Sequence, residues 1–227
     1  SNNTIVGDSA LSVATTATEN VVMGGDAMVG VPASVALTGV TAIGQKAFQG
    51  SSSTTTGANY TTAIGYEALK VLTTGGYNLA IGYQAGDAIT TGAYNIAIGD
   101  SALGSETDCD ASIAIGYQAG FLQVSAGSAG DDTGNTIVGH QAQRFNETGT
   151  NNTYLGYKAG YGASGGNNSD NTGVGKDALL AITSGQYNVA IGQGTGTALT
   201  SANYNTLLGR VAGALITTTE GCTLLGY

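Results

Sequence analysis

The sequence predicts an all-β fold: a parallel β-solenoid of thirteen repeats of about 17 residues that occupies the whole chain, residues 1–227, as a single domain. Three observations predict it, namely a recurring glycine-centred motif, a fixed residue type at each repeat position, and an unusual composition. The chain holds 38 Gly, one Pro and no Trp, and only 9% of its residues are charged. Such usage is typical of a regular stacked backbone rather than of a core of bulky side chains.

The repeat unit consists of an aliphatic residue, a glycine that we call the motif glycine, and usually an alanine three residues later. The motif glycines are Gly7, Gly24, Gly44, Gly65, Gly82, Gly99, Gly116, Gly139, Gly156, Gly175, Gly192, Gly209 and Gly226. A unit of this length holds a short strand and its turns but no helix pair. It therefore suits one coil of a solenoid, with neighbouring coils about 4.8 Å apart.

The residue before each motif glycine is apolar in every repeat, and we call this column the aliphatic ladder. We predict that it fills the interior of the coils, facing a second wall made by the alanine column three residues after the glycine. The predicted core ladder comprises Ile43, Ile64, Ile81, Ile98, Ile115, Val138, Leu155, Val174, Ile191 and Leu208.

The residue two before the motif glycine forms the strand-centre ladder, and it is apolar too. Successive side chains of a strand point to opposite faces, so we predict that this column faces outward. Its oligomer-facing members are Ala63, Ala80, Ala97, Ala114 and Ala190. A strand that is apolar on both faces is expected to be buried on both. We therefore expect other copies of the chain to cover it, most simply in a parallel homotrimer.

Asparagine recurs four residues before the motif glycine. Its side chain can bond the equivalent residue of the next coil while it satisfies turn backbone, so the sequence predicts a buried asparagine ladder at one corner. The ladder comprises Asn78, Asn95, Asn135, Asn152, Asn171, Asn188 and Asn205.

The sequence motif of several repeats is similar to that of a known family. The segments NTIVGDSAL, NLAIGYQAG and SIAIGYQAG resemble the repeats of YadA-like trimeric adhesin heads, and the longer spelling TTGAYNIAIG resembles repeats of phage tail fibres. The resemblance implies a left-handed parallel β-roll that assembles as a trimer. It also implies an extracellular, cell-surface or virion location and attachment to a cell-surface glycan or protein receptor.

Catalytic and cofactor chemistry finds no support in the sequence. The single histidine, His140, occupies a variable position after a motif glycine, and Gly173–Lys176 lacks the Ser or Thr of a phosphate loop. Asp108–Asp110 and Asp131–Asp132 are weak candidates for a cation contact. We predict no enzymatic activity, no cofactor and no metal site.

Net charge and hydropathy exclude two classes of partner. The formal net charge is −9, and the six Lys and Arg residues are scattered along the sequence, which argues against nucleic acid as a partner. The chain has no apolar run of the length that a membrane-spanning helix needs, so we expect no membrane insertion.

Tyrosines gather in two columns, five residues before and one residue after the motif glycine. Stacked one coil apart, they suit either mutual packing or contact with sugars. The column after the glycine is the candidate ligand surface and comprises Tyr66, Tyr83, Tyr117 and Tyr157. Insertions at one repeat position predict loops along one edge, either for recognition or as neutral length variation, near Val31–Pro32, Gln49–Thr56, Ser125–Thr133 and Ala163–Asp170.

Two other functions are open. Neither end of the sequence shows a capping segment, so head-to-tail docking into an extracellular filament is the main alternative. Ice binding ranks lower, because the threonine column three residues before the motif glycine is interrupted by apolar residues and is therefore expected to point inward. Cys109 and Cys222 lie about six coils apart, roughly 30 Å at strand spacing, so we predict no bridge between them within one chain.

Overall fold

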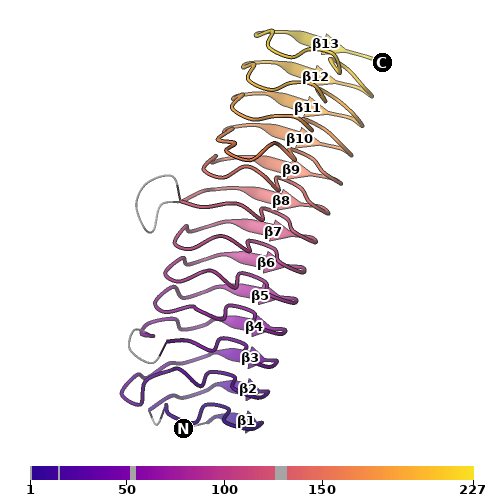
Figure 1. Cartoon of the computed structure of the whole chain (residues 1–227). Coiled ribbons are helices and arrows are strands. Elements are labelled where there is room, and N and C mark those ends of the chain that lie inside the picture. Colours follow the sequence, from indigo (N-terminus) through magenta and orange to yellow (C-terminus); the bar gives the residue numbers. More distant parts are fainter. Residues whose placement is uncertain (1, 15, 52–54, 126–131) are drawn as a thin grey trace.

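The chain folds as a single stack of coils. The computed structural model describes residues 2–14, 16–51, 55–125 and 132–227. Its strands form one parallel sheet in chain order, so that each coil adds one strand to the rod (Figure 1). The strands are β1 (Thr4–Val6), β2 (Val21–Met23), β3 (Thr41–Ile43), β4 (Thr62–Ile64), β5 (Leu79–Ile81), β6 (Ile96–Ile98), β7 (Ile113–Ile115), β8 (Thr136–Val138), β9 (Thr153–Leu155), β10 (Thr172–Val174), β11 (Val189–Ile191), β12 (Thr206–Leu208) and β13 (Thr223–Leu225). The predicted parallel β-solenoid is confirmed.

Each strand occupies the three residues before a motif glycine, and neighbouring strands pair without offset. Ala80 pairs with Ala97 and Ile81 with Ile98, for example, so that equivalent repeat positions lie directly above one another. This register converts every column of the sequence into a ladder of like side chains along the rod. None of the described segments forms an apolar helix of membrane-spanning length.

The motif glycine is required by backbone geometry. Its φ lies between +118° and +142° along the chain. A Cβ at Gly82 would lie 2.6 Å from the carbonyl oxygen of Gly99 in the next coil. A side chain at this position would therefore push adjacent coils apart, which explains why the repeats from Gly7 to Gly209 keep the glycine.

The two faces of the strand are the reverse of the sequence prediction. The strand-centre residues Ala63, Ala80, Ala97, Ala114 and Ala190, which were expected to face other copies, are buried inside the coil. The aliphatic ladder, which was expected to form the core, points away from the interior. Its members Leu155, Ile191 and Leu208 are 49%, 39% and 47% exposed, and Ile43, Ile64, Ile81, Ile98, Ile115, Val138 and Val174 are partly exposed.

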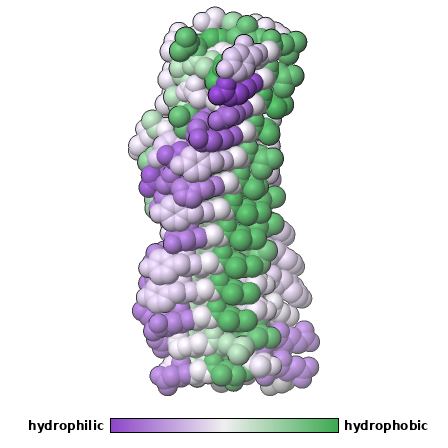
Figure 2. Space-filling view, turned by 90° about the vertical axis from the view of Figure 1, so that its right-hand side faces the viewer, coloured by the Kyte–Doolittle hydropathy of each residue, from purple (hydrophilic) through white to green (hydrophobic). Residues whose placement is uncertain are grey.

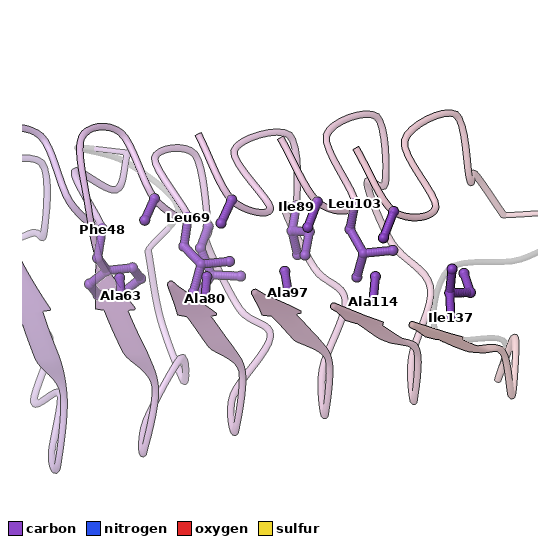
Figure 3. Packing of buried hydrophobic residues seen from close by; sticks show 14 of the residues in the cluster. Phe48, Ala63, Leu69, Ala80, Ile89, Ala97, Leu103, Ala114 and Ile137 are labelled. Atoms are coloured by element: carbon purple, nitrogen blue, oxygen red, sulfur yellow. The ribbon is translucent and has the colours of Figure 1, made fainter. Parts of the chain in front are cut away.

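The narrow interior of the coil explains this orientation. Leu69, Ile89 and Leu103 project from the wall opposite the sheet toward the strand-centre alanines, as the close view in Figure 3 shows. These large side chains already fill the space, so only a methyl group fits beneath them on the sheet side. The bulk of the core comes from the wall opposite the strands and not from the strands.

Two large strand-centre residues, Tyr154 and Ile137, lie where the facing side chains are reduced to glycine. Tyr154 is fully buried in β9, and Cβ atoms added at Gly160 or Gly173 would collide with its ring. Ile137 packs in the same way against Gly120. A Cβ added at Gly120 would lie 2.9 Å from the Cδ1 of Ile137. Each of these two enlargements is therefore matched by a glycine on a facing or neighbouring coil, which keeps the interior close-packed.

The asparagine ladder is confirmed, and its bonds explain how the coils keep their register. The Oδ1 of Asn95 accepts the backbone N–H of Ser112 at 2.9 Å, and its Nδ2 donates to the carbonyl of Cys109 at 2.8 Å. Each such asparagine thus holds the next coil at two points. The same pattern links Asn135 to Asn152 and Asn188 to Asn205. Because these side chains are buried, every bond satisfies a backbone group that water cannot reach.

Candidate interaction surfaces

The outer face of the sheet is an extended apolar feature of the surface. The aliphatic ladder and the residues three before the motif glycine point to this face together, since alternate residues of a strand share a side. Figure 2 shows the result as a continuous hydrophobic stripe along the length of the rod. We call it the apolar sheet face. In the central strands β5 to β7 both columns are aliphatic, from Leu79 and Ile81 to Ile113 and Ile115.

The threonine column also lies on this face, which corrects the prediction that it points inward. Its members Thr4, Thr153, Thr206 and Thr223 are exposed, and Thr41, Thr62, Thr136 and Thr172 are partly exposed. From the sequence alone, the apolar interruptions at Val21, Leu79, Ile96, Ile113 and Val189 indicate burial. They belong instead to the same outward stripe as the aliphatic ladder.

The tyrosines form stacked ladders, as the spacing predicts. Tyr77 stacks between Tyr60 and Tyr94, with ring centroids 5.3 and 5.1 Å apart. In the candidate ligand column Tyr66 stacks on Tyr83 at 5.4 Å. Each stacked ring covers one face of its neighbour, and the rings at the ends of a stack have one face that no other ring covers. Mutual packing is therefore realised along both columns.

The column that follows the motif glycine continues after strands β7 to β10, where it contains a histidine and a lysine as well as tyrosines. His140 stacks between Tyr117 and Tyr157 at centroid distances of 5.0 and 5.2 Å, and the ammonium of Lys176 lies 5.8 Å from the centre of the Tyr157 ring. Lys158 connects this row to a second one, since its Nζ lies 5.5 Å from the centre of Tyr157 and 4.9 Å from that of Tyr161.

The second row contains an arginine between aromatic rings. The guanidinium carbon of Arg144 lies 4.6 Å from the centre of the Phe145 ring and 5.7 Å from that of Phe121, and its Nη1 donates to the hydroxyl of Tyr161 at 3.4 Å. Phe145 and Tyr161 meet edge to face at 5.0 Å. We call Tyr117, Phe121, His140, Arg144, Phe145, Tyr157, Lys158, Tyr161 and Lys176 together the basic-aromatic patch.

Sequence reasoning missed this patch because the cations are far apart in the sequence. Three of the six Lys and Arg residues and the single histidine lie in it, together with two of the three phenylalanines. The prediction that the basic residues are scattered is therefore wrong for the folded chain, because half of them lie in one patch. The signal lies in the repeat alignment, where Arg144, Lys158 and Lys176 follow the motif glycines of three successive coils by five, two and one residues.

One group of potential metal ligands exists among the described residues, formed by Glu106, Asp108 and Cys109. The Oε1 of Glu106 accepts the backbone N–H groups of Asp108 and Cys109 at 3.1 and 2.8 Å, which closes a tight turn. Burial raises the pKa of the Cys109 thiol far above its usual range, and the hydrogen bond and charge of Glu106 add to this effect. The two backbone hydrogen bonds that Glu106 accepts give this group a structural role in the turn.

The other residues that the sequence offers as candidates for a cation contact or a phosphate loop make ordinary structural contacts where the structure describes them. Asp110 accepts the backbone N–H of Ala93 at 2.6 Å. Asp131 lies outside the described residues, as do residues 52–54 and 126–130 of the predicted loop edge. Gly173–Lys176 spans the end of β10 and the following turn, and no helix begins there among the described residues. Lys176 instead forms an ion pair of 3.6 Å with Asp177.

A cavity lies at the last coil, lined by Val211, Gly213, Ala214, Leu215, Ile216, Thr217, Thr219 and Tyr227. No charged side chain lines it. Cys109 and Cys222 are both free, which confirms that no bridge joins them.

Comparison of the chain with protein-family models, with curated proteins and with solved structures finds no match.

Proposed function

We propose that this chain is a non-enzymatic fibre protein whose solenoids associate in parallel through the apolar sheet face, as a homotrimer that serves attachment from a cell or virion surface. The observation that carries the proposal is the continuous aliphatic stripe on β5 to β7, where both outward columns consist of leucine and isoleucine. Contiguous apolar surfaces of this kind mark protein interfaces. The repeat spelling, which resembles that of trimeric adhesin heads and tail fibres, supports the role in attachment.

The shape of the stripe favours parallel association about an axis along the rod. The aliphatic ladder is isoleucine in five successive strands, β3 to β7, so identical chains placed side by side in parallel bring like rows together along this stretch. The face also lacks any charged residue among the outward positions of the thirteen strands. A face of this composition loses no hydrated charge when another copy covers it.

Sedimentation equilibrium at low concentration tests the assembly. The proposal expects a mass three times that of the chain, and a monomeric mass would overturn it. Ile98→Lys places a charge in the middle of the apolar sheet face and is expected to dissociate the oligomer. Val71→Lys is the matched control, because Val71 is 37% exposed but does not belong to the strand columns of the sheet face. Binding to cells or to a glycan array, with both variants included, tests attachment.

A second candidate function is ice binding, and the outward threonine column favours it. Thr136, Thr153 and Thr172 occupy equivalent positions on the adjacent strands β8 to β10, each with an aliphatic residue two positions later. A flat sheet that repeats hydroxyl and methyl groups at strand spacing can order water. Thermal hysteresis that Thr153→Leu abolishes would support this function. The two candidates use the same face, so a stable oligomer argues against ice binding.

A further inference from the structure

We propose that the basic-aromatic patch on the coils of β7 to β10 binds a linear anionic polysaccharide. The inference deepens the proposed attachment function by naming the class of receptor. Every residue of the patch belongs to one chain, so binding at the patch can be tested whatever the oligomeric state.

Two of the three basic residues of the patch have no ion-pair partner within the described part of the chain. Arg144 and Lys158 have no carboxylate within ion-pair distance there, and Lys176 has one partner, Asp177, at 3.6 Å. The lysines outside the patch are used differently, because Lys46 and Lys70 both pair with Glu67, at 3.8 and 2.9 Å. In a chain of net charge −9, a surface that gathers uncompensated cations is expected to bind an anion.

The aromatic rings of the patch also favour an anionic ligand. Tyr117, His140 and Tyr157 stack on one another, so they present ring edges, which carry the positive end of the ring quadrupole, together with hydrogen-bonding tips. Tyr117 and Tyr157 are 42% and 43% exposed. Ring edges and hydroxyl groups beside ammonium groups suit a ligand that carries both anionic groups and hydroxyls, as acidic sugars do.

The shape of the patch favours a linear polymer. Its outer row runs from Tyr117 to Lys176 over four successive coils, with one side chain from each coil, which corresponds to roughly 14 Å at strand spacing. Single-stranded nucleic acid is a poorer fit, because it needs free ring faces on which bases stack, and the facing sides of Tyr117, His140 and Tyr157 cover one another.

Matched variants test the patch. Lys176→Gln removes a cation that lies 5.8 Å from the ring centre of Tyr157, and Arg210→Gln removes the equivalent cation outside the patch, which lies 5.3 Å from the ring centre of Tyr227. Both occupy the position after a motif glycine. A stronger variant combines Lys158→Gln with Lys176→Gln. Binding is measured by biolayer interferometry on immobilised heparin, polygalacturonate, dextran and DNA, at low and at physiological salt.

We expect the unmodified protein to bind heparin or polygalacturonate, and the comparison of the two distinguishes a sulfated from a carboxylated ligand. Dextran should not bind. The double variant should lose about tenfold in affinity, equivalent to about 1.4 kcal/mol, while Arg210→Gln should change it less than twofold. The absence of binding to both anionic glycans, an equal loss in Arg210→Gln, or equally tight binding of DNA would overturn the proposal. Light scattering on the same samples reports the oligomeric state, so a failure of the trimer is recognised separately.

Discussion

The backbone N–H of Asn95 donates to the Oδ1 of Asn78 at 2.9 Å, across a separation of 17 residues in the sequence. Asn95 makes the same kind of bond to the following coil. Its side-chain Oδ1 accepts the Ser112 N–H, and its Nδ2 donates to the Cys109 carbonyl. This chain of bonds holds each coil at a fixed height above the previous one. The register of the parallel sheet therefore depends on a side chain outside the strands.

Loss of one ladder asparagine is expected to be costly. Asn95→Ala leaves two buried backbone groups without partners, so the free energy of unfolding should fall by about 2–4 kcal/mol. Chemical denaturation followed by circular dichroism measures it. Asn167→Ala, at an exposed side chain, is the control and should change stability by less than about 0.5 kcal/mol. Equal effects of the two substitutions would contradict a structural role for the ladder.

The fit of Tyr154 over a glycine predicts a second stability effect. Gly160→Ala places a methyl group against the Tyr154 ring at a φ of +59°, and the two effects together should cost about 2–4 kcal/mol. Gly165→Ala has a similar φ, +82°, but open space around it, and should cost about 1–2 kcal/mol.

A double-mutant cycle separates the collision from the backbone cost. In a Tyr154→Ala background the penalty of Gly160→Ala should fall to that of Gly165→Ala, because the ring is gone. A penalty that stays unchanged in this background would show that the ring does not constrain residue 160.

The two cysteines should differ in reactivity. Cys109 is buried and its pKa is raised by burial, whereas Cys222 is partly exposed. Iodoacetamide at pH 8 should therefore label Cys222 in the native protein and leave Cys109 unmodified, because the thiolate is the reactive species. Peptide mass spectrometry measures both sites, and labelling in denaturant should reach both. Fast native labelling of Cys109 would contradict its burial.

Glu67 makes stability depend on acid pH. A hydrogen bond from Gln84, and then the hydrogen bond and charge of Lys70, lower the pKa of this carboxyl group below its usual value. Its contribution is therefore present above the unfolded pKa of about 4.3 and is lost as the pH falls through the lower, folded pKa.

Comparison with Glu67→Gln isolates this contribution. The variant should be less stable than the unmodified protein by about 1–2 kcal/mol at pH 7, and the difference should shrink below pH ~4. Glu106, whose pKa is raised by burial, has the opposite pH dependence but is present in both proteins, so its effect cancels. A constant difference from pH 7 to pH 3 would show that the charge of Glu67 is not involved.

The sequence by itself determined the repeat, and with it the position of each strand. The motif glycine follows every strand from β1 to β13 and has a positive φ in each repeat, and from Gly7 to Gly209 its contact with the next coil also excludes a side chain. The asparagine and tyrosine ladders follow from the same alignment, since parallel pairing without offset stacks equal positions. These features are local or periodic, and a single sequence records both.

The tertiary structure alone decided which face of the strand is inside. Alternation fixes only that Ala80 and Ile81 point to opposite sides, and both are apolar, so hydrophobicity does not choose between them. The choice depends on the opposite wall, where Leu69, Ile89 and Leu103 fill a narrow interior and leave space for methyl groups only. The basic-aromatic patch likewise required the stack, because His140, Lys158 and Lys176 become neighbours only when separate coils lie at strand spacing.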